Sequence, residues 1–134
     1  MNKLSIPYHL LIPAIISGVL LLLTFLTQRR FFEKRKILWL ALLTFFSSYT
    51  LITAFSVYDT IDVELSASKF DLNKNGLYEE TELTEEAKKA LAKISNDTGR
   101  NFSIITGFIF TLILSLFVFI SGALLKTAIA KLKK

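Results

Sequence analysis

The chain has 134 residues, of which 52% are hydrophobic, and its formal net charge is +5 at pH 7. It contains no cysteine, which excludes disulfide bonds, thiolate metal sites and cysteine nucleophiles. The composition is too apolar for an ordinary soluble domain, and the apolar residues are concentrated in a few segments instead of being spread evenly.

Three long segments contain no Asp, Glu, Lys or Arg: Leu4–Gln28, Ile37–Tyr58 and Asn101–Leu125. A helix needs about 20 residues, at about 1.5 Å each, to cross the roughly 30 Å hydrocarbon layer of a bilayer. The first segment ends in a Gln-Arg-Arg flank with no small-residue cleavage site, which favours a retained anchor over a cleaved signal peptide. We therefore predict an all-α membrane protein with three transmembrane helices, at about residues 5–28, 37–58 and 101–125.

The basic residues flank these predicted spans. The link 29–36 and the tail after the third span contain Arg29, Arg30, Lys34, Arg35, Lys36, Lys126, Lys131, Lys133 and Lys134, against one acid, Glu33. The loop 59–100 instead holds ten acidic and six basic residues. Short segments rich in Lys and Arg stay cytoplasmic. We predict the plasma (bacterial inner) membrane, with the N-terminus and loop 59–100 extracytoplasmic, and the link and C-terminus cytoplasmic.

Small and hydroxyl-bearing residues recur in the predicted spans. The third span has Ser103, Gly107, Thr111 and Ser115 at every fourth position, and such a stripe allows another helix to approach closely. The second span is rich in Ser and Thr, which leaves two interpretations open: hydrogen bonding within and between helices, or the lining of a water path. Three helices bury little surface, so we expect some of these faces to meet other membrane-protein subunits or a second copy.

The segment DLNKNGLYEETE, residues 71–82, spaces oxygen-bearing groups around a single glycine, Gly76. These groups include the side chains of Asp71, Asn73, Asn75, Glu79 and Glu82, and the main-chain carbonyl of Leu77 lies among them. Every fixed position of the pattern D-x-[DN]-x-[DN]-G-x5-E is filled. The segment resembles an EF-hand calcium loop, and the resemblance implies a Ca²⁺ site built from these six residues, with a sharp turn at the glycine.

The flanks of the loop have helical periodicity. Before it, Val63, Ala67 and Phe70 share one face of an entering helix, and after it an apolar stripe contains Leu83, Ala87, Ala90, Leu91 and Ile94. The sequence therefore predicts an EF-hand-like helix-loop-helix within the loop domain 59–100.

Three features depart from the usual EF-hand. Asn at the third and fifth positions leaves three formal negative charges, the eighth position is Tyr78, and the chain has no sister loop. We therefore expect weak, millimolar affinity, which suits the predicted extracytoplasmic location. The alternative is an acidic, solvated turn without an ion.

No catalytic constellation accompanies this loop, so we expect no enzymatic activity, and the sequence identifies no small-molecule substrate. A nucleic-acid partner is not expected either, because the basic residues form short flanks. The leading hypothesis is a Ca²⁺-binding accessory or structural subunit of a larger membrane assembly, in contact with membrane lipids. The alternative is a homo-oligomeric channel or transport component, lined by the second span and modulated by external Ca²⁺.

Overall fold

The computed structural model describes residues 6–31 and 35–132, and every regular element within these ranges is a helix. The elements are α1 (Tyr8–Leu26), the single turn α2 (Gln28–Phe31), α3 (Lys36–Ser68), α4 (Glu85–Ser95) and α5 (Thr98–Leu132). Three of the helical segments are long and apolar enough to cross a membrane, as predicted. The predicted roles of Glu33, Lys34, Lys133 and Lys134 fall outside the described residues.

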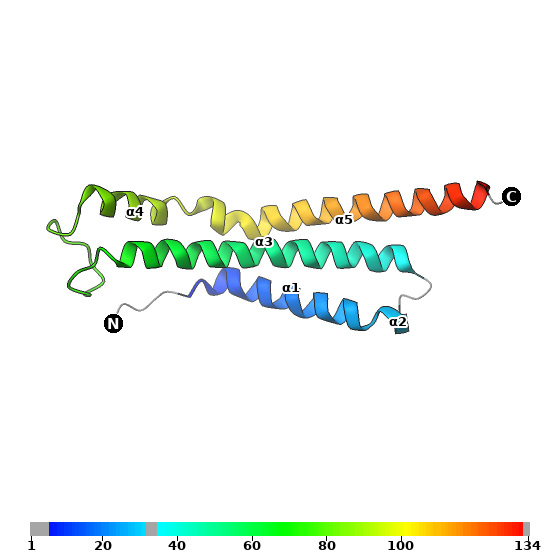
Figure 1. Cartoon of the computed structure of the whole chain (residues 1–134), viewed down its shortest axis with the longest axis horizontal. Helices are drawn as coiled ribbons and strands as arrows, with labels where there is room; N and C mark the ends of the chain where they lie inside the picture. Colours follow the sequence, from blue (N-terminus) through cyan, green and yellow to red (C-terminus); the bar gives the residue numbers. More distant parts are fainter. Residues whose placement is uncertain (1–5, 32–34, 133–134) are drawn as a thin grey trace.

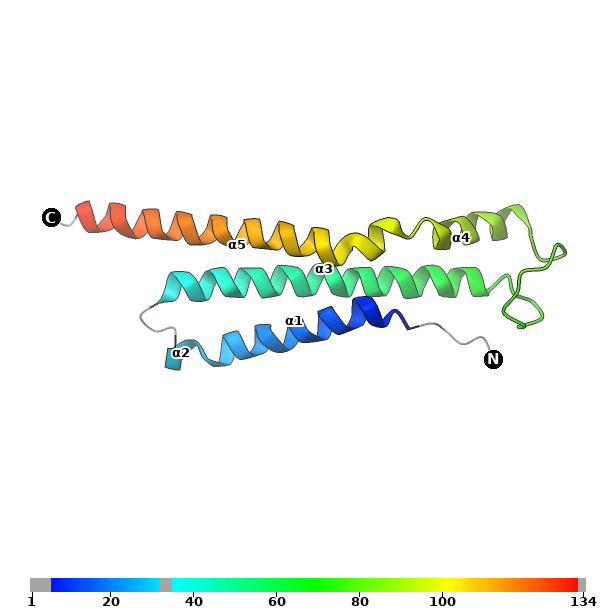
Figure 2. The same cartoon turned by 180° about the vertical axis from the view of Figure 1, so that it is seen from behind.

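The helix α3 is the centre of an elongated bundle. Both α1 and α5 pack along it, while contacts between α1 and α5 are few. Figures 1 and 2 show α1 and α5 on either side of α3, with α4 beside the last turns of α3. The start of α1 and the loop before α4 lie toward one end, and α2 and the end of α5 lie toward the other.

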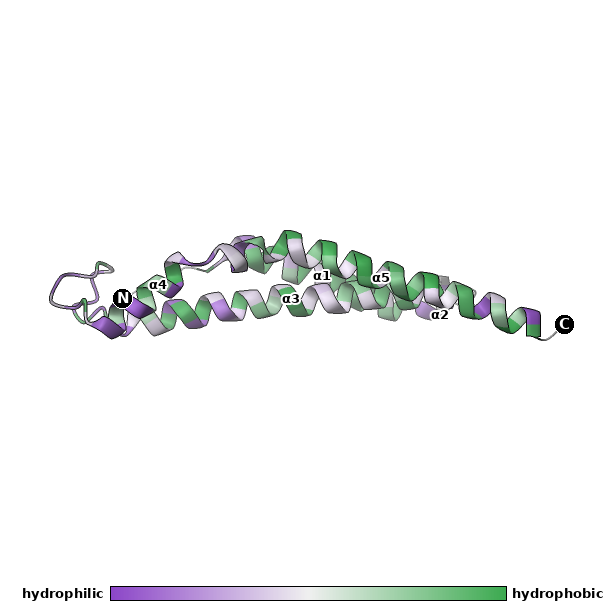
Figure 3. Ribbon diagram, turned by 90° about the horizontal axis from the view of Figure 1, so that it is seen from above, coloured by the Kyte–Doolittle hydropathy of each residue, from purple (hydrophilic) through white to green (hydrophobic). Residues whose placement is uncertain are grey.

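Charge is separated along this axis. All acidic residues that the structure describes lie within residues 59–97, and the opposite end carries Arg30, Arg35, Lys36, Lys126 and Lys131. Hydrophobic residues dominate the middle of the bundle (Figure 3). The uncharged part of α3, residues 37–58, has a length of about 33 Å at 1.5 Å per residue, close to the thickness of a hydrocarbon layer. The remainder of α3 extends beyond that thickness as a continuous helix.

The packing of α1 on α3 uses small and hydroxyl side chains. Ser17 Oγ donates to the carbonyl of Phe46 at 3.2 Å, and it lies 2.9 Å from Thr50 Oγ1. A Cβ added to Gly18 would lie 3.8 Å from Cγ2 of Thr50, which is an ordinary van der Waals contact. Near the basic end, Trp39 Nε1 donates to the carbonyl of Thr24 at 3.0 Å.

The packing of α5 on α3 is closer. A Cβ added to Gly107 would lie 2.9 Å from Cγ2 of Ile52, so only glycine fits there without a shift. The whole predicted stripe, Ser103, Gly107, Thr111 and Ser115, is buried. These residues therefore bring α5 against α3 of the same chain, and they provide no surface for a partner subunit.

Most hydroxyl groups of the second predicted span form hydrogen bonds within the protein. The donors to carbonyls three or four residues earlier are Thr44, Ser47, Thr50, Thr53 and Ser56. Tyr49 OH donates to the carbonyl of Ile104 in α5 at 3.3 Å. These bonds support hydrogen bonding within and between helices, one of the two interpretations of this span.

Candidate metal centre

The candidate site lies between α3 and α4, at the acidic end of the bundle. The two helices contact each other, and Val63, Ala67 and Ala87 from the predicted apolar faces are buried. Thr84 caps α4, because its Oγ1 accepts the backbone N–H of Ala87 at 3.1 Å. Glu85 in the first turn of α4 complements the helix dipole. These contacts hold the two ends of the loop 71–82 near each other.

The first half of the loop turns around the carboxylate of Asp71. Its two oxygens accept the backbone N–H groups of Asn75 at 3.2 Å and Gly76 at 3.0 Å. The N–H of Asn75 also donates to Asn73 Oδ1 at 3.0 Å, so the side-chain oxygens of Asp71 and Asn73 converge on one donor. The sharp turn expected at Gly76 is present: its φ of 83° lies in the left-handed region that glycine adopts without strain.

Glu82 closes the loop. Its Oε1 accepts the backbone N–H groups of Leu72 at 2.9 Å and Asn73 at 3.1 Å, and its Oε2 accepts that of Glu79 at 3.4 Å. Glu79 Oε1 in turn accepts the side-chain amides of Asn73 at 3.3 Å and Asn75 at 3.1 Å. The five predicted side-chain ligands, Asp71, Asn73, Asn75, Glu79 and Glu82, thus belong to one hydrogen-bonded network.

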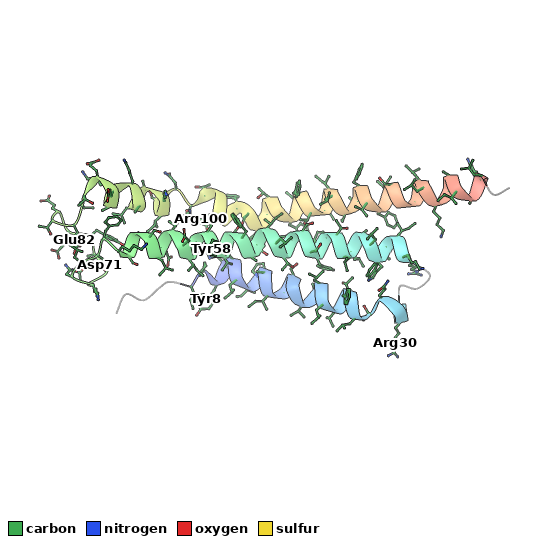
Figure 4. All side chains as sticks on the ribbon, viewed as in Figure 1. Tyr8, Arg30, Tyr58, Asp71, Glu82 and Arg100 are labelled. Carbon is green, nitrogen blue, oxygen red and sulfur yellow. The ribbon has the colours of Figure 1, made fainter. Side chains whose placement is uncertain are left out.

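Two of these carboxylates are shielded from solvent: Asp71 is 4% exposed and Glu82 is 5% exposed. Figure 4 shows both at the tip of the bundle. Neither buried carboxylate forms an ion pair with a Lys or Arg side chain among the described residues. Buried carboxylates in proteins are usually paired with a cationic side chain or coordinate a metal. Here backbone N–H groups provide only partial charge.

The donor set suits a hard cation such as Ca²⁺, which prefers carboxylate, amide and carbonyl oxygens. Among the described residues, no three Asp, Glu or His side chains gather closely enough to hold a metal by themselves. A site in this loop would therefore depend on Asn73, Asn75 and the carbonyl of Leu77 as well. This dependence matches the low formal charge of the loop and the weak affinity that we predict.

The pKa of Tyr78 is raised by its surroundings in the loop. Burial raises the pKa of its phenol, and the negative charges of Asp71, Glu82 and Glu64 raise the pKa further. In the sequence this residue was notable only as a departure from the EF-hand pattern at the eighth position. In the structure Tyr78 is half-buried, and both shielded carboxylates interact electrostatically with its phenol.

A layer of polar contacts that the sequence does not indicate joins α1, α3 and α5. Arg100 is only 16% exposed at its side chain; it lies 3.5 Å from Asp59 of α3 and donates to the carbonyl of Lys93 at 2.9 Å. Asn101 Oδ1 is 2.6 Å from His9 Nε2 of α1. Tyr8, Tyr58 and Arg100 lie at one level of the bundle (Figure 4). No local pattern marks this layer, because its members come from three helices that are distant in the sequence.

Comparisons of the chain with protein-family models, with curated proteins and with solved structures found no match. The function is therefore inferred from the residues of the loop and from the bundle that carries it.

Proposed function

We propose that this protein is an integral membrane protein that binds Ca²⁺ in an EF-hand-like loop on the extracytoplasmic side. The ligands are the side chains of Asp71, Asn73, Asn75, Glu79 and Glu82 and the carbonyl of Leu77. The observation that carries the proposal is the pair of shielded carboxylates, Asp71 and Glu82, at opposite ends of one loop without a cationic side-chain partner.

A bound Ca²⁺ supplies positive charge between the two ends of the loop. Asp71 follows the end of α3 and Glu82 precedes α4, so neutralising both would hold the start of α4 to the end of α3. The helix α3 is continuous from the predicted span to Ser68, so the loop is joined to the membrane segment by an unbroken helix. The site is thus positioned to stabilise the extramembrane end of the bundle.

The separation of charge along the bundle supports the proposed sidedness. The described basic end carries Arg30, Arg35, Lys36, Lys126 and Lys131, and short basic segments stay cytoplasmic. The loop, at the other end, then faces a compartment where millimolar Ca²⁺ is plausible, which suits a site of low charge.

The role that we propose for the whole chain is that of an accessory or structural subunit of a larger membrane assembly. Large apolar side chains cover the outer faces of α1 and α5, among them Ile16, Phe25, Phe110 and Phe117, and lipids or neighbouring subunits would cover them. The stripe on α5 no longer supports a partner surface, because α3 occupies it. Co-purification from membranes in mild detergent tests this role, since an isolated chain without stable companions would contradict it.

The homo-oligomeric channel is the weaker candidate. Several hydroxyl groups of α3 donate their proton to backbone carbonyls, which leaves fewer of them to donate to water in a pore. Planar-bilayer recordings separate the two functions. Calcium-sensitive conductance from the purified chain alone would favour the channel over the accessory subunit.

A terbium titration tests the metal site. Tb³⁺ substitutes for Ca²⁺, and excitation of Tyr78 should produce terbium luminescence that added Ca²⁺ displaces. The double variant Asp71→Ala with Glu82→Ala should lose this signal, whereas Glu85→Ala with Glu86→Ala, which removes two exposed charges from the first turn of α4, should keep it. Equal luminescence in both double variants would reject the site.

The absence of cysteine makes sidedness directly testable. Single cysteines replacing Lys74 in the loop and Lys131 near the end of α5 report on opposite ends of the bundle. A membrane-impermeant maleimide should label Lys74→Cys in intact cells and Lys131→Cys only after permeabilisation. The reverse labelling pattern would place the loop in the cytosol. The loop would then not be exposed to millimolar external Ca²⁺, which would contradict the proposed site.

A further inference from the structure

A groove of about 770 Å³ lies at the basic end of the bundle, between the first turn of α3 and the last turns of α5. Figures 1 and 2 show that α5 continues past the start of α3, so one side of its last turns is not covered by α3. Three cationic side chains, Arg35, Lys36 and Lys126, line this groove. Apolar residues, including Phe119 and Ile129, line the rest.

The groove lies where α5 approaches α3 closely, and Gly122 and Ile37 both line it. A Cβ added to Gly122 would lie 2.8 Å from Cγ2 of Ile37, so the two helices are in direct contact at this level. Beyond it α3 begins at Lys36, while α5 runs on to Leu132. The groove therefore opens where the predicted spans end, with its apolar wall continuous with the spans.

The charge of the groove is uncompensated within the described chain. Arg35, Lys36 and Lys126 form no ion pair there, and every described acidic residue lies within residues 59–97, at the other end. The first turn of α3 has no side-chain cap and no acidic residue. Its unpaired N–H groups and the helix dipole add partial positive charge at the same place. The groove is thus electrostatically complementary to an anion.

An inorganic anion would leave the apolar wall unused, and an uncharged lipid would leave the three cations unused. We propose that this groove binds an anionic phospholipid, with its phosphate beside Arg35, Lys36 and Lys126 and an acyl chain along Phe119, Leu125 and Ile129. Basic pockets between helices at the cytoplasmic membrane surface have the chemistry that such headgroups require. The inference rests on the proposed membrane insertion and orientation, and it is independent of Ca²⁺ binding.

Native mass spectrometry of the full chain tests the proposal, with phosphatidylglycerol and phosphatidylcholine of identical acyl chains as probes. The wild-type chain should retain phosphatidylglycerol in preference to phosphatidylcholine. The triple variant Arg35→Gln, Lys36→Gln, Lys126→Gln should lose phosphatidylglycerol binding by about tenfold or more, because each basic residue near the surface contributes a several-fold factor. Circular dichroism checks that the variant remains helical.

Two controls separate the groove from general electrostatic attraction. The triple variant Lys88→Gln, Lys89→Gln, Lys93→Gln removes the same charge from α4 and should bind as the wild type does. Lys131→Gln changes a basic residue of α5 that does not line the groove, and it too should have little effect. An equal loss in either control, or retention of phosphatidylglycerol by the groove variant, would overturn the proposal.

Two further experiments test whether the groove binds a lipid and not free phosphate, and whether the chain is inserted in the membrane. Excess inorganic phosphate should not displace the lipid, because phosphate cannot use the apolar wall; complete displacement would overturn the lipid site. Alkaline carbonate treatment should leave the chain in the membrane pellet. Extraction by carbonate would contradict membrane insertion itself, whereas an integral chain without preference for phosphatidylglycerol would contradict only this inference.

Discussion

Glu82 Oε1 accepts the backbone N–H of Leu72 at 2.9 Å, which joins the last residue of the loop 71–82 to its second residue. The bond places a shielded carboxylate beside the residue that follows Asp71, the other shielded carboxylate. A loop closed in this way gathers negative charge where a cation is needed.

Glu82→Gln should abolish Ca²⁺-dependent stabilisation while leaving the loop closed. The amide oxygen of Gln can still accept the N–H groups of Leu72 and Asn73, so the substitution removes the charge and the long 3.4 Å bond from the N–H of Glu79 but keeps these two bonds. In the wild type, Ca²⁺ at ten times the Kd should stabilise the fold by about 1.4 kcal/mol. Thermal unfolding in detergent with and without Ca²⁺ measures this difference. Glu85→Gln, at a side chain 81% exposed, should respond to Ca²⁺ as the wild type does; loss of the response in both variants would contradict the assignment.

Ca²⁺ should lower the pKa of Tyr78. Burial first, and then Asp71, Glu82 and Glu64, raise the pKa of this phenol above its ordinary value, because they disfavour the phenolate. A bound cation offsets the carboxylate charges, so deprotonation then begins at lower pH. The difference between the phenolate absorbance titrations of the wild type and Tyr78→Phe isolates this residue. A Tyr78 titration that Ca²⁺ leaves unchanged would indicate that no cation binds near the two carboxylates.

Gly76→Ala should weaken Ca²⁺ binding by about tenfold. An alanine held at the φ of 83° found at Gly76 costs about 1–2 kcal/mol, although no atom lies within 4 Å of the added Cβ. The cost is therefore conformational and not steric. Gly99→Ala is the matched control, because Gly99 lies in the first turns of α5 and its added Cβ also meets nothing. That variant should leave affinity unchanged and slightly stabilise the helix. Calcium titrations of both variants, monitored by the displacement of bound terbium, compare their Ca²⁺ affinities.

Gly107→Ala should destabilise the bundle by about 1–3 kcal/mol, because its Cβ would lie 2.9 Å from Cγ2 of Ile52. Gly18→Ala should be tolerated, since its Cβ would meet Cγ2 of Thr50 at 3.8 Å. Gly107→Ala should cost less in an Ile52→Ala background than in the wild type, because the methyl group that the added Cβ meets has been removed. Thermal unfolding of the purified variants in one detergent tests the series. Equal stability of the two single glycine variants would mean that α5 does not pack on α3 as described.

The three long apolar helices could be predicted because each depends on a local property, an uncharged run long enough to cross a bilayer. The loop residues could be assigned candidate roles for a similar reason. Oxygen-bearing side chains from Asp71 to Glu82 are placed by their spacing along the chain, and the turn at Gly76 depends on its own backbone. Whether these groups bind Ca²⁺ stays a prediction that the terbium titration tests.

Contacts between distant segments could not be predicted. The stripe from Ser103 to Ser115 was expected to allow a helix to approach, but its pattern does not identify which helix, and α3 of the same chain occupies it. The pairing of Arg100 with Asp59 and that of Asn101 with His9 likewise require α5 to lie at a definite height against α3 and α1.

The amino-acid sequence alone determined where the chain is apolar, where its charge lies, and which oxygen atoms the loop 71–82 can offer, because these properties belong to single residues and to their spacing. The tertiary structure decided that α3 lies in the middle, that α5 packs on it through Gly107, and that Asp71 and Glu82 are shielded from solvent. These features depend on how side chains from separate helices fit together. The side chains of two helices can fit together only after both helices have formed, so these contacts are determined when the helices pack.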